Sequence, residues 1–599
     1  MCGIVGYTGK SPCGGFLYEG LKRLEYRGYD SAGAAFCTTE GIFCQKKRGK
    51  VQNVRSFCLR RRETTGIAHT RWATHGKPND LNAHPHVFGH FALVHNGIVE
   101  NAEALRSQLL TPCRSETDSE VLLHTIAACY EGDLLQAVRN ALTQCSGSWA
   151  IAVISDYHPE EIVCARRQSP LVVGKGKNGI FVASDVYALH GLCEQIFLPP
   201  EDSLVRLRRP AAEREEAERI EGIAGDTGVT GGAGIAGVEA FDMQLSPLPV
   251  LPQAMPPMPP IQSIGHRTHM EAEIEEIPRA VSDTARSLAQ ANLPDLPKVQ
   301  AVFATGCGTA FHACVAFRYR MQRYGKPIIA EQAGELRSGC VRFPKNSLLV
   351  AVTQSGETAD TLAAIRLAKS QNVQTLVITN VRHSSAAREA DFALFTEAGT
   401  ETAVAATKSF NCQLMALYFL AAKCVGRPVP DFTDLPSLCE AAVEADVTQA
   451  VKKLYKKRGM FCLGQNADYA IAREGALKIK EICYLFSEGY PAAELKHGSL
   501  SLIESGFPVL AIVTQKSALK KMKNTLREAK SRGATTLVLS QYREALAEAD
   551  VPVLLPMAEE DLMPILAVIP LQKIAVELCL KKKLSPDYPR NLAKSVTVE

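Results

Sequence analysis

Hydrophobic and polar positions follow different patterns in the two halves of the chain. Residues 2–218 contain many short apolar segments of strand length, among them Gly89–Ile98, Ser148–Ser155 and Ser203–Leu207. A few segments between them, such as Leu134–Leu142, carry apolar residues at helical spacing. This mixture predicts an α+β layered domain.

The second half repeats a strand, a turn and a helix. Its strands are short, continuous apolar runs rich in β-branched residues, which is typical of parallel strands buried on both faces of a sheet. They are Ala301–Gly308, Leu348–Gly356, Gln374–Asn380, Met460–Gln465, Pro508–Gln515 and Thr535–Gln541.

An internal repeat is visible in this half. Thr353-Gln354 recurs as Thr514-Gln515, 161 residues later, and Gly306 at the first turn recurs as Gly464, 158 residues later. The repeat predicts two copies of one doubly wound α/β unit.

Composition changes sharply between the halves. Gly222–Val238 is rich in glycine and Pro247–Pro260 is rich in proline. Glycine-rich chain is flexible and proline-rich chain is extended, so we expect a linker that packs no core. The predicted boundaries are 2–218 for the first domain, 219–265 for the linker, 285–428 and 455–589 for the two α/β units, and 590–599 for a C-terminal tail.

Charge and hydropathy exclude several classes of protein. The 67 Lys and Arg against 63 Asp and Glu leave a net charge of +4, too little for a dedicated nucleic-acid binder. No uninterrupted apolar run approaches the ~18 residues of a membrane span. Residues 1–6 lack the charged segment of a secretory signal, so we expect a cytoplasmic protein without a membrane partner.

The chain has 19 cysteines, and no two of them form a CxxC pair. In a cytoplasmic protein they are expected to be reduced and mostly buried. Cys2 is the exception, because removal of Met1 would place a free α-amine beside its thiol. An α-amine titrates near pH 8 and can take the thiol proton, as in other N-terminal nucleophiles. The alternative is a buried hydrophobic side chain like the other cysteines.

Polar clusters downstream of Cys2 favour the nucleophile. They are Arg27–Gly33, His69–Gly76, Asn82–His86, His95–Ile98 and Ser115–Asp118. The histidines lack a Cys or carboxylate at ligand spacing, so no metal site is expected. Arg71 offers a fork for a carboxylate and Asp118 a counter-charge for an ammonium. Asn96 and the Gly97 N–H can stabilise an oxyanion. Together these groups fit hydrolysis of the side-chain amide of glutamine.

Cys2-Gly3-Ile4-Val5-Gly6 and these clusters resemble class II glutamine amidotransferase domains, which are N-terminal-nucleophile sandwiches. The resemblance implies that Cys2 attacks the amide and that Asn96 and Gly97 form the oxyanion hole. It implies a gate for ammonia at Trp72. It implies glutamine-binding residues at Arg71, Thr74, His75, Gly97 and Asp118.

The turns of the α/β units point to a phosphorylated ligand. The turn Thr305–Ala310 does not begin a dinucleotide fingerprint, because that motif needs a third glycine at position 311, which is Phe311 in this chain. Thr353–Thr358 is rich in hydroxyls and leads into a helix, whose N-terminal N–H groups suit a phosphate. The alternative is that Ser355 only caps the helix. The paired units with TQSGET resemble sugar isomerase (SIS) domains, which implies a phosphosugar site in the first copy. The second copy, with Thr514–Ser517, lacks the pattern.

Three further elements carry possible chemistry. Lys478 and Glu481 lie three apart, hence on one helix face, His497 lies in ELKHGS, and Lys594 lies in the tail. Each also has a purely structural interpretation. These are a surface ion pair, a histidine whose hydrogen bonds are made within the fold, and a frayed tail. The chemical interpretation is a Schiff-base lysine, a carboxylate that moves a proton α to a carbonyl, and a histidine that opens a sugar ring.

A class II glutaminase followed by two SIS domains and the ending NLAKSVTVE resembles the glutamine–fructose-6-phosphate aminotransferase (isomerising) family over the whole chain except the linker. The resemblance implies that Lys594 forms the Schiff base with open-chain fructose 6-phosphate. It implies that Glu481 moves the proton between C1 and C2, with Lys478 nearby, and that His497 assists ring opening. The sugar phosphate site is expected at Thr309, Thr353, Gln354, Ser355, Thr358 and Val404.

The same resemblance implies glutamine and fructose 6-phosphate as substrates, ammonia transfer inside the protein, a homodimer, and no metal or organic cofactor. Ala310 departs from the family, which usually has Ser there. Other class II amidotransferases are disfavoured, because neither a phosphoribosyl-binding acidic pair nor an SGG-type ATP loop is present. A non-catalytic sugar-phosphate sensor is a further alternative, against which Cys2, Glu481 and Lys594 argue.

Overall fold

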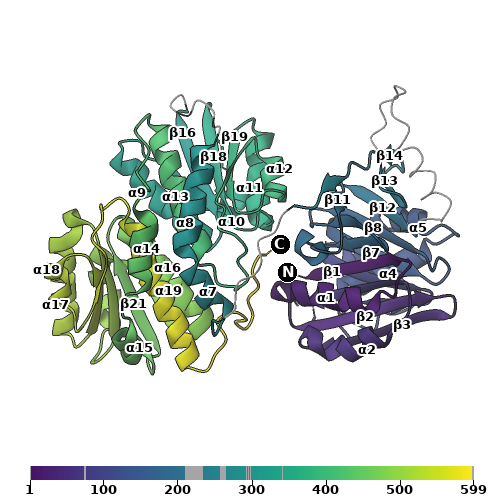
Figure 1. Cartoon of the computed structure of the whole chain (residues 1–599), viewed down its shortest axis with the longest axis horizontal. Helices are drawn as coiled ribbons and strands as arrows, with labels where there is room; N and C mark the ends of the chain where they lie inside the picture. Colours follow the sequence, from purple (N-terminus) through teal and green to yellow (C-terminus); the bar gives the residue numbers. More distant parts are fainter. Residues whose placement is uncertain are drawn as a thin grey trace. The chain divides into compact units, whose positions relative to one another are not determined.

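The computed structural model describes residues 2–72, 76–209, 234–256, 265–291, 293, 296, 299–339 and 341–596. The chain divides into two compact units (Figure 1). The first unit comprises Met1–Met258 and Ser595–Glu599, and the second Pro259–Lys594.

Two antiparallel sheets form the first unit. The first sheet has the order β15 (Gln253–Ala254), β11 (Gln195–Phe197), β9 (Val172–Gly176), β10 (Gly179–Ala183), β1 (Gly3–Gly9), β4 (Thr65–Arg71), β2 (Ser31–Thr38) and β3 (Gly41–Arg48). The second has the order β14 (Pro247–Leu248), β13 (Val238–Asp242), β12 (Ser203–Arg208), β8 (Glu161–Arg167), β7 (Gly147–Ser155), β6 (Phe91–Val99) and β5 (His86–Phe88).

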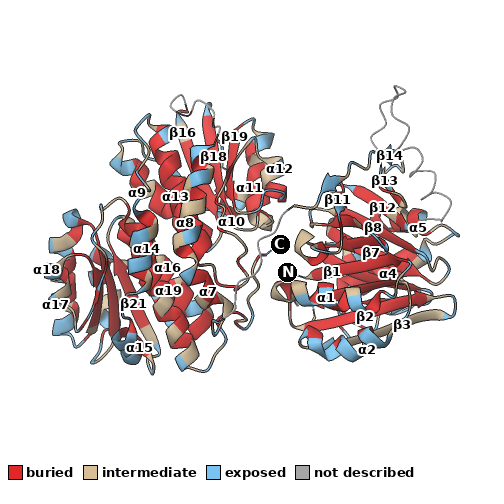
Figure 2. Ribbon diagram, in the orientation of Figure 1, coloured by how far each residue is buried: buried red, intermediate tan, exposed pale blue. Residues whose placement is uncertain are grey.

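Helices cover the outer faces of these sheets. They are α1 (Gly14–Leu24), α2 (Arg55–Arg60), α3 (Ala102–Arg106), α4 (Asp118–Ala128) and α5 (Leu134–Leu142). One core lies between the sheets, a second between the second sheet and α4 and α5, and a third between the first sheet and α1. This confirms the α+β sandwich, and Figure 2 shows its strands as largely buried.

The expected linker differs from the structure in its second part. Val238 and Ala240 of β13 are buried, and β13 pairs with β12 along its whole length. Val238 and Ala240 lie on one face of β13 and Glu239 and Phe241 on the other, with Glu239 exposed and Phe241 half-buried, a short pattern inside a segment that is otherwise rich in glycine and proline. The interpretation as chain without a packed core is therefore wrong for residues 238–242. Residues 210–233 and 257–264 lie outside the described residues, and the domain boundaries themselves stay a prediction.

Two five-stranded parallel sheets form the second unit. One has the order β17 (Ile329–Gln332), β16 (Ala301–Gly306), β18 (Ser347–Val352), β19 (Gln374–Thr379) and β20 (Phe392–Phe395). The other has the order β22 (Phe486–Pro491), β21 (Gly459–Gly464), β23 (Pro508–Val513), β24 (Thr535–Ser540) and β25 (Val551–Leu554). The two strand orders correspond one to one along the chain, which confirms the repeat.

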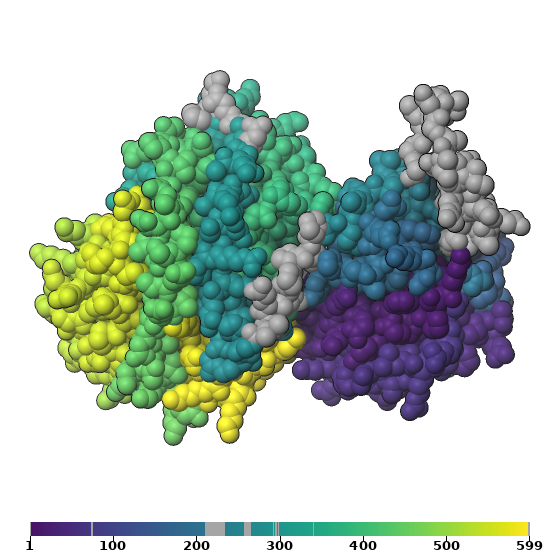
Figure 3. Space-filling view, in the orientation of Figure 1, coloured from purple at the N-terminus to yellow at the C-terminus, as the bar shows by residue number. Residues whose placement is uncertain are grey.

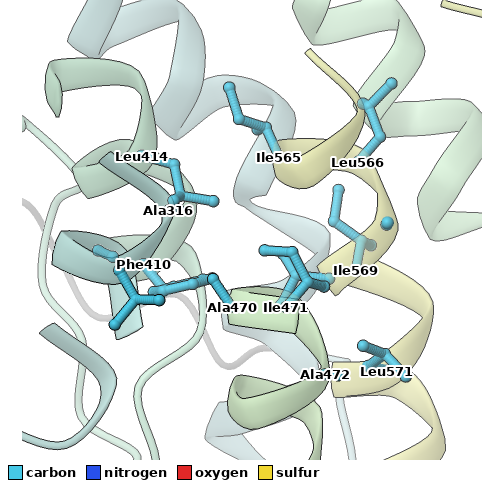
Figure 4. Packing of buried hydrophobic residues seen from close by; sticks show 14 of the residues in the cluster. Ala316, Phe410, Leu414, Ala470, Ile471, Ala472, Ile565, Leu566, Ile569 and Leu571 are labelled. Atoms are coloured by element: carbon cyan, nitrogen blue, oxygen red, sulfur yellow. The ribbon is translucent and has the colours of Figure 1, made fainter. Parts of the chain in front are cut away.

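The helices of this unit pack on the faces of the sheets. They are α7 (His269–Glu275), α8 (Ile277–Ala289), α9 (Thr309–Arg323), α10 (Ala333–Ser338), α11 (Ala359–Ser370), α12 (Ser385–Glu389), α13 (Lys408–Cys424), α14 (Leu435–Val443), α15 (Thr448–Leu454), α16 (Ala467–Cys483), α17 (Leu519–Ser531), α18 (Arg543–Leu546) and α19 (Met563–Lys581). Figure 4 shows apolar side chains of α9, α13, α16 and α19 meeting in one core, which joins the two copies of the repeat.

Helix α19 is long and apolar enough, by length and composition, to cross a membrane. Within the unit, however, 83% of its most apolar window is buried, as expected for a core helix. The chain after α19 returns to the start of the unit, where the Asp587 carboxylate accepts the backbone N–H groups of His269 and Met270. Figure 3 shows this yellow C-terminal chain against the teal segment of α7 and α8.

Candidate active site

Cys2 precedes the central strand β1 of the first unit. Its Sγ lies 3.4 Å from the backbone nitrogen of Trp72, which follows β4 directly. The pairing of β1 with β4, in which Gly3 faces Thr70, brings the two residues together. The thiol therefore lies beside the predicted gate residue, at the end of two paired strands.

Asn96 and Gly97 lie on β6 of the other sheet, and Asn96 reaches the same place. The Asn96 Nδ2 donates to the carbonyl oxygen of Cys2 at 3.1 Å. Gly97 has φ +141°, and a Cβ there would lie 2.0 Å from the carbonyl oxygen of Ser148. Only glycine fits this position, so its N–H keeps an orientation that another residue would disturb.

A buried histidine orients the Asn96 amide. His69 Nε2 lies 3.0 Å from Asn96 Oδ1 and 3.2 Å from the carbonyl oxygen of His95. Both partners are acceptors, so Nε2 carries the hydrogen. Burial lowers the pKa of His69 to about 3 and holds the pKa of the neighbouring His84 well below its ordinary value. Sequence reasoning gave His69 no role.

Arg71 and Asp118 are both buried in this unit. The Asp118 Oδ2 accepts the backbone N–H of Val99 at 2.8 Å, which fixes the start of α4 against the end of β6. The predicted residues Thr74 and His75 lie outside the described residues. Among the residues that are described, no three His, Cys, Asp or Glu side chains form a group that could hold a metal ion.

The predicted phosphate loop follows β18 of the second unit. Thr353 Oγ1 accepts the N–H of Gly356 at 3.2 Å and lies 3.3 Å from Thr358 Oγ1. Ser355 Oγ accepts the N–H of Glu357, so it shapes the loop and does not cap α11, which begins after Thr358. The alternative in which Ser355 only caps the helix is therefore wrong.

Thr309, Gln354 and Val404 lie on three different segments. Thr309 begins α9 after β16, and β16 pairs with β18, so its turn and the phosphate loop lie at one edge of the sheet. Gln354 is half-buried in the phosphate loop. Val404 lies in the segment after β20, where its N–H donates to the carbonyl of Asp587. The second unit thus gathers the hydroxyl-bearing residues at the carboxyl ends of adjacent strands.

Lys478 and Glu481 form an ion pair of 2.7 Å on α16, with the Lys478 side chain 1% exposed. The surface interpretation of this pair is therefore wrong. Lys478 Nζ also donates to Thr309 Oγ1 at 3.0 Å. Burial alone would lower the pKa of Lys478, but Glu474 and Glu481 raise it above its ordinary value. The ammonium is therefore permanently charged.

Sequence reasoning missed Glu474, one turn before Lys478. This fully buried carboxylate accepts from Thr309 Oγ1 at 3.0 Å and contacts His312 Nδ1 at 2.8 Å. Burial alone would raise its pKa, but Lys478 lowers it below the ordinary value. Its spacing of four from Lys478 was the available signal.

The Lys594 side chain is buried and pairs with Glu401, which sequence reasoning also missed. Glu401 further accepts from the backbone N–H groups of Thr407 and Ser409 and from the Ser409 hydroxyl. Burial alone would raise the pKa of Glu401, but Lys594 and these donors lower it to about 2. The tail is therefore docked at Lys594, and the frayed-tail interpretation is wrong for this residue.

His497 is the remaining residue predicted to take part in the sugar chemistry. It follows the short helix Ala492–Lys496 and is exposed. Over the described residues, no hydrogen bond or ion pair joins its ring to Lys478, Glu481 or Lys594.

Comparisons with known proteins cover both units. The glutamine amidotransferase domain family matches residues 69–191, and the SIS domain family matches residues 296–423 and 453–582. The chain is 40% identical to glutamine–fructose-6-phosphate aminotransferase (isomerizing) of Symbiobacterium thermophilum and 40% identical to that of Pyrococcus horikoshii, with both chains covered completely in each case.

A solved structure, the C-terminal domain of glucosamine-fructose-6-phosphate aminotransferase from Francisella tularensis, matches with a TM-score of 0.52 and 31% identity. It covers 55% of this chain and 100% of its own. With its glutaminase sandwich, its two SIS copies and these full-length relatives, the chain belongs to the glutamine–fructose-6-phosphate aminotransferase (isomerizing) family.

Proposed function

We propose that this chain hydrolyses glutamine in its first unit and uses the ammonia to convert fructose 6-phosphate to glucosamine 6-phosphate in its second. The names of the relatives supply both substrates. The observation that carries the proposal is the hydrogen bond from Lys478 to Thr309. This bond joins Thr309, which is predicted to bind the sugar phosphate, to Lys478, a member of the pair that is predicted to move a proton on the sugar.

In the first reaction the Cys2 thiol gives its proton to the α-amine freed by removal of Met1 and adds to the amide carbon of glutamine. The oxyanion accepts from Asn96 Nδ2, which has one hydrogen besides that donated to Cys2, and from the Gly97 N–H. Ammonia leaves with the proton returned to it, and water hydrolyses the thioester to glutamate. Arg71, Asp118, Thr74 and His75 bind the amino acid.

In the second reaction the phosphate is bound at Thr353–Thr358 and Thr309, beside Val404. His497 assists ring opening. The Lys594 amine then forms a Schiff base at C2 of the open ketone, with loss of water. Ammonia replaces Lys594 at C2.

Glu481 completes the reaction by removing a proton from C1 and returning it to C2, which yields the 2-amino aldose. Lys478 supports the role of Glu481, because its ammonium lies 2.7 Å from the carboxylate and holds it in place on the same helix face. Ammonia passes between the sites inside the protein, with Trp72 as its gate. The scheme uses only side chains and substrates.

The family resemblance also supports a homodimer in the cytoplasm that binds neither nucleic acid nor membrane. The small net charge of +4 supports the last two points. Light scattering on the purified chain tests the dimer, and a monomeric mass would contradict it.

A product assay tests the function. With glutamine and fructose 6-phosphate the wild type should form glutamate and glucosamine 6-phosphate in equal amounts. Cys2→Ala should form neither from glutamine. Lys594→Arg keeps the ion pair with Glu401 but forms no Schiff base, so it should lose the amino sugar and keep glutamine hydrolysis. Glutamate without amino sugar from the wild type would refute the proposal, and amino sugar from Lys594→Arg at the native rate would refute the Schiff-base role.

A further inference from the structure

The second unit contains a cavity of about 370 Å³ that is lined by residues of both SIS copies. It lies where β21 and β23 end, between Asn466 and Gln515 on one side and the end of α9 on the other. In the first SIS copy the corresponding edge of the sheet carries the predicted phosphate loop.

The repeat shows how closely the two places correspond. Helix α9 begins at Thr309 and α16 at Ala467, 158 residues later. The residue before each helix has nearly the same backbone, with φ 53° and ψ −121° at Gly308 and φ 58° and ψ −130° at Asn466. Asn466 keeps a conformation that glycine adopts freely and asparagine rarely does. The turn before α9, beside the predicted phosphate loop of the first SIS copy, is thus retained before α16 in the second copy.

The same offset places two arginines where the first site has its reactive pair. Arg320 is the counterpart of Lys478, and Arg323 is the counterpart of Glu481. Lys478 on α16 reaches the start of α9, and Arg320 and Arg323 on α9 line the cavity at the start of α16. The second place therefore has two cations where the first has a cation and a carboxylate.

A carboxylate of the chain occupies the corresponding anion position. Lys516, 161 residues after Ser355, donates its backbone N–H to Glu560 Oε1 at 2.9 Å, and the Tyr542 hydroxyl donates to the same oxygen at 2.8 Å. Arg320 and Arg323 both pair with Asp561. Arg320 is buried, and its Nε has no hydrogen-bond partner over the described residues.

The segment that carries these carboxylates lies at the surface. It connects β25 to α19, and its Met557 is 71% exposed. The Glu560 side chain is 25% exposed and lies 3.9 Å from Arg323 Nη2, beyond hydrogen-bond distance. Glu560 is thus held by one backbone N–H and one hydroxyl, contacts that a stronger anion can take over.

We propose that this cavity is a second, non-catalytic site for a small phosphorylated molecule, whose phosphate replaces the Glu560 carboxylate at the Lys516 N–H and lies beside Arg320 and Arg323. The site binds without reaction, because Arg323 stands where a proton-moving carboxylate would be needed, and Ala467 where Thr309 supplies a hydroxyl. The inference rests on the proposed function only in assuming that Thr353–Thr358 of the first SIS copy binds the sugar phosphate.

Equilibrium binding to the full chain tests this, with fructose 6-phosphate and inorganic phosphate as separate probes. The wild type should bind two molecules of fructose 6-phosphate per chain. Arg323→Ala, at a half-exposed side chain, should weaken the second class at least tenfold and leave the first class and the turnover unchanged. Glu560→Gln should tighten the second class by a similar factor. Arg527→Ala is the matched control, because Arg527 is an exposed arginine of the same unit that pairs with Glu548 and does not line the cavity.

The two probes distinguish the sources of the phosphate. Equal affinity for both means that the site recognises phosphate alone, and higher affinity for the sugar phosphate means that it also recognises the sugar; both support the proposal. A single class in the wild type, or a second class unaffected by Arg323→Ala, would overturn it. If the chain made no amino sugar, the number of molecules bound at this cavity would be unchanged. The two proposals can therefore fail separately.

Discussion

The orientation of one amide group governs the glutaminase site. Asn96 can offer its Nδ2 to an oxyanion only while Oδ1 faces His69, 3.0 Å away. Because burial lowers the pKa of His69 to about 3, its imidazole is neutral throughout the physiological range and keeps a single hydrogen for two acceptors. His69 is thus a positioning residue for the proposed oxyanion hole.

Replacing His69 by Phe should therefore impair the chemistry more than the binding. The ring volume is kept, but Asn96 loses the donor that holds its Oδ1. We expect kcat for glutamine hydrolysis to fall about 100-fold, as for loss of an oxyanion-hole donor, with KM for glutamine changed little. Steady-state glutaminase kinetics measure both.

His90→Phe is the matched control, because His90 lies in the same unit, is exposed, and bonds to Asp156 and stacks on the exposed Tyr157. Its kinetics should equal those of the wild type. An unchanged kcat in His69→Phe would show that Asn96 is held without it.

Among the elements, α16 supplies both the proposed reactive pair, Lys478 and Glu481, and a close helix contact. A Cβ at Gly475 would lie 2.8 Å from Leu571 Cδ1 and 3.3 Å from Leu571 Cβ, so α16 and α19 approach each other where α16 has no side chain. This contact sets the position of Glu474 and Lys478, the residues on either side of Gly475 along the helix.

Gly475→Val should destabilise the second unit by about 1–3 kcal/mol through overpacking against α19. Gly475→Ala should be nearly neutral, because better helix propensity, about 1 kcal/mol, offsets a contact that the end of the Leu571 side chain can relieve. Urea denaturation followed by circular dichroism measures both. Leu571→Ala combined with Gly475→Val should recover part of the loss, and equal stability of Gly475→Val and wild type would refute the close contact.

Elements with a clear period were predictable from sequence. Leu134–Leu142 is α5 as predicted, and Ser203–Leu207 differs from β12 by one residue. β13 was missed because a glycine-rich composition was weighed above a short alternation. Glu401 was missed for a different reason, since nothing local in a sequence reveals that a carboxylate is buried beside a lysine distant along the chain. Glu474 is local, four residues before Lys478, but its burial against Thr309 and His312 comes from another helix.

Across the whole molecule, buried neutral histidines make stability depend on pH. Burial lowers the pKa of His69, His84, His86 and His95 in the first unit. Below the ordinary value of 6.5 the unfolded chain binds a proton on each of them and the folded unit does not. The free energy of unfolding therefore falls as the pH falls, by about 2 kcal/mol per fully shifted histidine at pH 5.

In His84→Phe the unfolded chain binds one proton fewer at low pH. Between pH 8 and pH 5 the free energy of unfolding of this variant should therefore fall by about 2 kcal/mol less than that of the wild type. The chain has 2 tryptophans, Trp72 and Trp149, and both lie in the first unit, so tryptophan fluorescence in urea reports this unit within the full chain. Equal pH dependence in the two proteins would mean that His84 is protonated in the folded state.

The central claim is that one chain couples two reactions by passing ammonia from Cys2 to the sugar at Lys594. The most direct measurement is the isotope content of glucosamine 6-phosphate formed from amide-¹⁵N glutamine and fructose 6-phosphate in an excess of unlabelled ammonium. The account predicts that nearly all of the amino sugar carries ¹⁵N. Amino sugar with the isotope content of the bulk ammonium would contradict it.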